Sequence, residues 1–354
     1  MKKGGEAMAP TTEWDKQALL KNCTAVKTVL MLLVVAYHSL LFWGGNWFTA
    51  KPSEISKPMY MAAQWLNSFH IYAFALVSGY VFYYSKCECQ KYQNFGPFLA
   101  NKLKRLLVPY AFVAAVWAIP IHCLFLSYDI RTLFTKFVLG TSPGQLWFLL
   151  MLFWVYIFFW FLSDFFASYP ILGGVVALIC YGVGVFGSMA APDAFMIWTA
   201  CRYVPFFWLG FKLRQTEGQI VFRMPWWLWI ALDLLLFVAM QIVGSFDTTF
   251  FKMLHMGLCF LLNVTGAIMA FVVIQKLAGH IRTEGKLFCL LSSRSMGIYL
   301  FHQQVIYFVI VGLDGYLWPS MTALACFLIS ITVSVWITGV LMKFWVTRCL
   351  IGEK

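Results

Sequence analysis

The stretch AVKTVLMLLVVAYHSLLF, residues 25–42, is an apolar run that contains a lysine at position 27 and a histidine at position 38. A run of this kind is typical of a membrane-crossing helix, because a hydrocarbon core of about 30 Å needs roughly 20 apolar residues. Each helical residue turns by about 100°, so Lys27 and His38 lie on one face, about 16 Å apart along the axis. Ionisable groups are costly in lipid, and this face is therefore predicted to line protein or a watery cavity.

The composition of the whole chain predicts the same environment. Of 354 residues, 62% are hydrophobic, 19% are aromatic and only 11% are charged. Long apolar runs without alternation favour helices over a membrane barrel. We therefore expect an all-α polytopic membrane protein with about ten transmembrane helices, centred on residues 25–44, 58–84, 106–127, 146–163, 169–189, 195–211, 225–244, 252–276, 287–312 and 319–342.

The distribution of Lys and Arg predicts the orientation of these helices. With a cytoplasmic N-terminus, eighteen of them fall in inside segments and five in outside loops, so both termini are expected in the cytoplasm. The net charge of +12 is then a topology signal plus attraction to anionic lipid headgroups, and nucleic acid is not an expected partner. We expect a cytoplasmic segment over 1–24, a single transmembrane domain over 25–348 and a cytoplasmic tail over 349–354. The polar start and full-length first span predict a retained anchor, without a cleavable signal peptide.

Ten cysteines lie mostly in or beside the expected spans, where thiols usually act as small apolar groups. Only Cys87 and Cys89 form a tight pair, and a single Cys-x-Cys is weak evidence for a metal site. We therefore expect no bound metal.

Ionisable residues inside the spans are the candidates for function. They are Lys27, His38, His70, His122, Arg202, Asp233, Arg294 and His302. The structural alternatives are Lys27 as a snorkelling cation, His38 as a helix-bridging hydrogen-bond partner, His70 and His122 as hydrogen-bonded core residues, and Arg202 with Asp233 as a tie between neighbouring helices.

Two further stretches add candidates. In SSRSMGIYLFHQQV, residues 292–305, Ser295 and His302 are seven positions apart and share a face, and His302 is expected near the depth of His38. In FLANKLKRLLVPY, residues 98–110, Lys102 and Arg105 form either a topology signal or a phosphate clamp.

Six sequence motifs, taken in their order along the chain, resemble those of the bacterial acyltransferase-3 family of integral membrane acyltransferases. The family has Arg, ten residues, then His in its first span, and Lys27 and His38 stand at those positions. The other matching stretches are FALVSGYVF (74–82), which contains Ser78, NKLKRLLVPY (101–110), QLWFLL (145–150), VPFFWLGF (204–211) and SMGIYLFH (295–302). The chain departs from the family where Lys27 replaces Arg, which keeps the charge but loses the bidentate fork, and where Thr24 replaces a frequent Asp.

The resemblance implies transfer of an acyl group, most often acetyl, from cytoplasmic acyl-CoA to a hydroxyl of a cell-surface or exported polysaccharide or its lipid-linked precursor. It also implies a multi-pass protein of the bacterial cell membrane, with membrane lipids and the polysaccharide synthesis machinery as partners. Acyl-CoA is then a substrate, and no permanently bound cofactor is expected.

Roles for individual residues follow from the resemblance. Lys27, Lys102 and Arg105, with Ser78, are expected to hold the donor, and Trp147 to line the acyl tunnel or to sit in an interfacial belt. His38 is expected to act as general base, because an unperturbed imidazole titrates near neutral pH, and His302 is the second catalytic candidate. Arg202, Ser295 and Arg294, together with His302, are expected to orient the acceptor or to stabilise the oxyanion of the tetrahedral intermediate. Direct transfer and an acyl-imidazole relay both remain open.

Two other functions fit the same composition. A transporter or flippase for a lipid-linked glycan also needs many spans and buried charges, although the sequence shows no two-fold repeat. A non-catalytic membrane partner of a polysaccharide-synthesis complex is the third possibility.

Overall fold

The computed structural model describes residues 13–45, 47, 51–126, 128–216, 219–278 and 283–353, with side chains omitted at 13–19, 219 and 220. Residues 1–12 of the expected N-terminal segment, Arg282 and Lys354 lie outside this range. The described part is all-helical and contains no strand. Its helices are α1 (Glu13–Leu41), α2 (Lys57–Asn67), α3 (His70–Tyr83), α4 (Phe95–Lys102), α5 (Val108–Val113), α6 (Ile119–Leu126), α7 (Ile130–Leu133), α8 (Trp147–Ser168), α9 (Pro170–Ala190), α10 (Ile197–Gln215), α11 (Gln219–Arg223), α12 (Trp226–Val243), α13 (Thr249–Ala278), α14 (Lys286–Ser293), α15 (Ser295–Leu313), α16 (Pro319–Leu341) and α17 (Trp345–Leu350).

The number of spans differs from the expected ten. In the described residues, eight helical segments are long and apolar enough to cross a membrane: Leu20–Gly44, Phe95–Leu126, Gly144–Ser168, Pro170–Ala190, Trp226–Val243, Thr249–Ala278, Ser295–Leu313 and Pro319–Leu341. Two expected spans are not among them. The first is the segment 58–84, which is broken between α2 and α3. The second is the segment 195–211, which corresponds to α10, a helix with three cations, Arg202, Lys212 and Arg214. The orientation of the bundle stays a prediction.

α3 and α10 are nevertheless largely buried in the bundle, and their backbones touch. A Cβ at Gly79 of α3 would clash with the carbonyl oxygen of Phe207, and a Cβ at Gly210 of α10 would clash with the carbonyl oxygen of Leu76. This reciprocal pair of glycines allows a closer approach than any other residue would, as small residues do between membrane helices.

We expect Gly79→Ala to lower the thermal stability of the purified protein, because the methyl group forces α3 away from α10. Overpacking of this kind costs about 1–3 kcal/mol and occasionally more. The matched control is Gly182→Ala in α9, where nothing lies within 4 Å of the added Cβ. Thermal unfolding in detergent tests this pair, and equal melting temperatures for the two variants would show that the close crossing is not essential.

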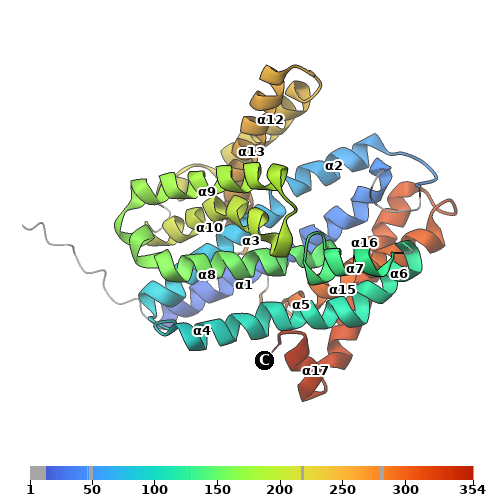
Figure 1. Cartoon of the computed structure of the whole chain (residues 1–354), viewed down its shortest axis with the longest axis horizontal. Coiled ribbons are helices and arrows are strands. Elements are labelled where there is room, and N and C mark those ends of the chain that lie inside the picture. Colours follow the sequence, from blue (N-terminus) through green and yellow to red (C-terminus); the bar gives the residue numbers. More distant parts are fainter. Residues whose placement is uncertain are drawn as a thin grey trace, which may run out of the picture.

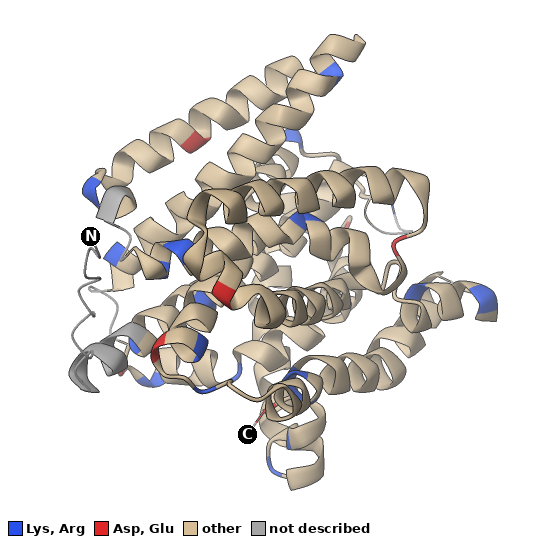
Figure 2. Ribbon diagram, turned by 60° about the vertical axis from the view of Figure 1, so that its left-hand side comes forward, with Lys and Arg blue, Asp and Glu red and all other residues tan. Residues whose placement is uncertain are grey.

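α1 lies in the interior of the bundle and packs against α3, α13, α15 and α16. α12 and the adjoining part of α13 project from the other helices (Figure 1). Lys and Arg gather near helix ends and connecting segments, and most of the ribbon carries no charge (Figure 2). The ionisable groups on α1 and α15 are therefore held inside a largely apolar assembly.

The segment that carries the basic cluster is a helix with two π-helical turns, Leu103–Leu107 and Ala114–Ala118. Pro109 has no N–H and cannot close a normal helical turn onto Arg105. Wider turns of this kind are frequent at functional sites. Here the first of them carries Arg105 itself.

Candidate active site

Two histidines from distant parts of the sequence meet between α1 and α15. His302 Nε2 lies 3.0 Å from His38 Nδ1, and the two ring centroids are 5.0 Å apart. His302 is fully buried, whereas His38 is partly exposed. The expectation that both imidazoles lie at similar depth is therefore matched by direct contact.

The hydrogen-bond partners assign the tautomers of the pair. His302 Nδ1 lies 3.0 Å from the carbonyl oxygen of Ile298 and 2.9 Å from that of Tyr299. Carbonyl oxygens only accept, so Nδ1 of His302 carries the hydrogen and Nε2 of the neutral ring is an acceptor. His38 then donates its Nδ1–H, shared between His302 Nε2 and the carbonyl oxygen of Val34 at 3.0 Å. The lone pair of neutral His38 is consequently on Nε2, where a general base needs it.

A third histidine lies close to the pair but has a different arrangement. His70 is 1% exposed, its Nδ1 lies 2.5 Å from the carbonyl oxygen of Leu66, and its ring lies 5.0 Å from that of Tyr37. Its Nε2 is buried without a hydrogen-bond partner in the described structure. His122 Nδ1 likewise lies 2.7 Å from a carbonyl oxygen four residues earlier, that of Ala118. Both therefore make the core hydrogen bonds that were the alternative for them.

A first cavity, of about 380 Å³, brings together most of the expected donor-binding residues. Its described lining includes the expected donor residues Lys27, Lys102, Arg105 and Ser78, together with Val34, Ile71, Phe74, Phe148, Tyr156 and Tyr299. Ser295, which was expected to orient the acceptor, also lines this cavity and not the second one. Three cations thus face one cavity with apolar walls. This combination suits an anionic group attached to an apolar arm.

One cation of this lining contacts an aromatic ring, and one carboxyl group lies beside the three cations. Lys102 is 9% exposed, and its Nζ lies 3.3 Å from the centre of the Tyr156 ring, in a cation–π contact. Glu353 of the C-terminal segment also lines the cavity, and burial raises the pKa of its carboxyl, although the neighbouring Arg105 acts in the opposite direction. The lining therefore carries more positive than negative charge.

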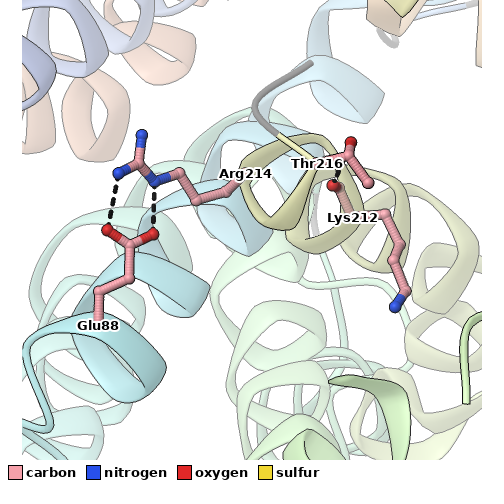
Figure 3. A network of polar contacts seen from close by, with 4 residues as sticks. All are labelled: Glu88, Lys212, Arg214 and Thr216. Carbon is pink, nitrogen blue, oxygen red and sulfur yellow. Dashed lines mark hydrogen bonds and ion pairs between the residues drawn. The ribbon is translucent and has the colours of Figure 1, made fainter. Parts of the chain in front are cut away.

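A nearby cation is neutralised and does not contribute to this cavity. Arg214 pairs with Glu88 through two parallel contacts, Nε to Oε1 at 2.6 Å and Nη2 to Oε2 at 2.7 Å, and each side chain is 13% exposed (Figure 3). Lys212 and Thr216 lie beside this pair, with the Thr216 hydroxyl donating to the Lys212 carbonyl at 2.9 Å (Figure 3). The pair ties the end of α10 to the turn after α3.

A second cavity, of about 520 Å³, lies at a different level of the same helices. Along α3, Ile71 and Tyr72 reach the second cavity, as does Asn67 at the end of α2, whereas Ile71, Phe74 and Ser78 reach the first. Along α8, Trp147 faces the second cavity, and the first is lined by Phe148, Leu149, Leu152 and Tyr156. Ile71 lines both, so the two cavities approach each other at this residue.

Arg202 lines the second cavity, and its partner differs from the expected one. Asp233 accepts a hydrogen bond from Trp65 Nε1 at 2.8 Å, so the expected tie between Arg202 and Asp233 is wrong. Arg202 instead donates from Nη2 to the Thr199 hydroxyl at 3.0 Å. The error arose because neighbouring spans were paired by depth, which does not determine the direction in which a side chain points.

Two other expected residues lie away from the first cavity. Arg294 donates to the carbonyl oxygen of Val335 at 2.9 Å, so its guanidinium faces α16. Trp147 lines the second cavity and is absent from the described lining of the first, where its neighbour Phe148 stands.

Several polar residues near the histidines were not singled out from the sequence. Gln145 and Gln304 are buried and bond each other at 2.7 and 3.0 Å, and the Tyr299 hydroxyl donates to the Gln145 carbonyl. Their signal was visible as amides inside apolar spans, but only ionisable groups were considered. Tyr156 and Glu353 gave no sequence signal, because their importance depends on contacts across helices.

No group of three or more His, Cys, Asp and Glu side chains among the described residues is arranged to hold a metal ion. The fold and the site define a multi-pass membrane protein with an imidazole pair, a basic cavity whose lining includes Val34 and Tyr299 beside that pair, and an aromatic cavity that meets the first at Ile71.

The family model described as an acyltransferase domain matches residues 21–339. The chain therefore belongs to the acyltransferase-3 family, and it is a membrane acyltransferase. No curated protein and no solved structure gives a significant match.

Proposed function

We propose that the protein is an O-acyltransferase that moves an acyl group, acetyl in the first instance, from cytoplasmic acyl-CoA to a hydroxyl of a cell-surface polysaccharide or its lipid-linked precursor. The observation that carries the proposal is the contact of His38 with His302, in a tautomer that leaves His38 Nε2 as a base. Membership of the family supports the acyltransferase class.

The first cavity is the proposed donor site. Lys27, Lys102 and Arg105 hold the phosphates of CoA through charge-assisted hydrogen bonds. The thioester arm extends along the apolar wall toward Val34 and Tyr299, whose carbonyl oxygens bond the two histidines. Neither cavity lining includes the histidines themselves, so donor binding has to open the last part of this route.

The proposed chemistry is a direct transfer. His38 Nε2 takes the proton of the acceptor hydroxyl as its oxygen attacks the thioester carbonyl carbon. The tetrahedral intermediate collapses, the carbon–sulfur bond breaks, and the CoA sulfur leaves as the thiol with the proton from His38. His302 Nε2 accepts the Nδ1–H of His38 throughout, which holds the ring in the useful tautomer and stabilises the imidazolium.

The test is release of free CoA by purified protein supplied with acetyl-CoA and a glycan acceptor, with acylated glycan measured in parallel by mass. Stoichiometric formation of both products is expected. Movement of the glycan across a vesicle membrane without any acylation would instead support the transporter alternative.

We expect Lys27→Gln to raise KM for acyl-CoA by about 10-fold or more, because a hydrogen bond to a charged group contributes about 1.5–3 kcal/mol. Lys21→Gln is the matched control, since Lys21 lies earlier on α1 and pairs with Glu284 at the surface, 2.9 Å away. Steady-state kinetics at varied acyl-CoA concentration measure the effect. An equal KM for the two variants would remove Lys27 from the donor site.

A further inference from the structure

The second cavity contains a guanidinium that no described carboxylate neutralises. None of the ion pairs in the described structure involves Arg202. Its Nε is buried and has no hydrogen-bond partner there, and its one protein acceptor is the Thr199 hydroxyl. A guanidinium has five N–H donors, and leaving them unpaired in a buried place is costly. The donors of Arg202 therefore have capacity for a ligand.

The nearest carboxylate along the chain is already occupied. Asp193 accepts the backbone N–H of Trp198 at 2.7 Å, the backbone N–H of Thr199 at 3.0 Å and the Thr199 hydroxyl at 2.5 Å. These contacts satisfy the free N–H groups at the start of α10. Asp193 thus fixes Thr199, and through it one nitrogen of Arg202, while the rest of the guanidinium stays available.

The lining of the cavity matches a charged sugar better than a neutral apolar ligand. Its described lining contains no Asp or Glu. Tyr72 and Tyr203 stack at 5.0 Å with 6° between their planes, and Trp147 lies 5.7 Å from Tyr203. Aromatic faces offer broad surfaces for C–H groups, and the amide and hydroxyls of the lining, on Asn67, Thr141, Ser142, Tyr181 and Thr199, offer hydrogen bonds.

We propose that the second cavity binds an acceptor carrying an oxyanion, and that Arg202 pairs with this group and makes the enzyme selective for acidic acceptors. The oxyanion is a uronic acid carboxylate or a phosphate of a lipid-linked glycan, both of which match the fork of a guanidinium. That the ligand is the acyl acceptor rests on the proposed function; that it is anionic rests on Arg202 alone. Because Ile71 lines both cavities, a sugar held by Arg202 lies next to the end of the donor cavity.

The experiment measures binding without acyl-CoA, on the full chain in lipid nanodiscs, through its tryptophan fluorescence. The probes are a trigalacturonate, its methyl ester, and a polyprenyl-diphosphate-linked disaccharide. We expect at least one anionic probe to bind about 10- to 100-fold more tightly than the neutral ester, and the tighter of the two identifies the source of the oxyanion. The proposal is overturned if neither anionic probe binds. It is also overturned if the trigalacturonate and the diphosphate-linked disaccharide both bind no more tightly than the methyl ester.

Variants assign the effect to one residue. Arg202→Gln should reduce affinity for the anionic probe to that of the ester, and Arg202→Lys should keep part of the preference. Arg131→Gln, at an exposed position on α7, removes the same charge and should change nothing. If Arg202→Gln does not fold, the difference in affinity between acidic and neutral probes, measured for the wild type and for Arg202→Lys, still tests the proposal. An anionic preference that survives in Arg202→Gln overturns the assignment.

The two proposals fail in different ways. If acidic probes bind through Arg202 but acetyl-CoA is never consumed, the acyltransferase function is wrong and the anion site stands. If neutral acceptors are acylated as readily as acidic ones, the function stands and the selectivity is wrong.

Discussion

We expect His38→Ala to lower the rate of acyl transfer by about 10² to 10⁴-fold, because positioned general-base catalysis contributes about that much. His38 Nε2 is the base of the proposed step, and its Nδ1 is committed to Val34 and His302 at 3.0 Å each. CoA release by the purified variant, at saturating donor and acceptor, measures the loss.

The companion variant is His38→Asn. Its side-chain N–H can take the place of Nδ1–H toward His302 and Val34, so the local contacts are kept while the base is removed. We expect His38→Asn to melt close to the wild type and to be as inactive as His38→Ala. Near wild-type turnover by either variant would show that another group removes the proton.

The second large effect is expected at His302, which acts through His38 as a positioning residue. His302→Ala removes the acceptor of the His38 Nδ1–H and should lower kcat by about 10²-fold or more with little change in KM for acyl-CoA. His302→Gln places a carbonyl oxygen near the former Nε2 and should restore part of kcat. Steady-state kinetics of both variants measure kcat and KM for acyl-CoA and so test this role of His302.

If His302 has only a structural role, the two variants are expected to differ from the wild type in another way. His302 is fully buried and bonded to the carbonyl oxygens of Ile298 and Tyr299, so its loss also affects packing. If Ala and Gln lower kcat equally, and only in proportion to the loss of folded protein in a melt, the hydrogen bond to His38 has no role in the reaction.

The apolar composition and the helical spacing predicted an all-helical membrane protein and most of its spans. They also placed His38 and His302 at one depth, because both were read as positions on long helices. The count of ten was not confirmed. The break at Ser68 and Phe69 and the three cations of α10 produce helices that are largely buried in the bundle yet fall short of a typical membrane span.

The sequence did not predict the direction in which several side chains point. Arg294 and Trp147 face α16 and the second cavity, and Asp233 bonds Trp65. Which way a side chain points depends on the rotation of its helix, and that is determined by contacts such as the glycine crossing of α3 and α10. A single sequence holds no record of those contacts.

The most direct test of the central claim uses vesicles with the protein inserted in one orientation. Labelled acetyl-CoA is supplied on the side of Lys102 and Arg105, and a glycan acceptor is sealed on the side of Arg202. Labelled glycan on the acceptor side is expected for the wild type, and none for His38→Asn. Label that appears only on glycan placed with the donor, or glycan that crosses unlabelled, would contradict transfer between the two cavities.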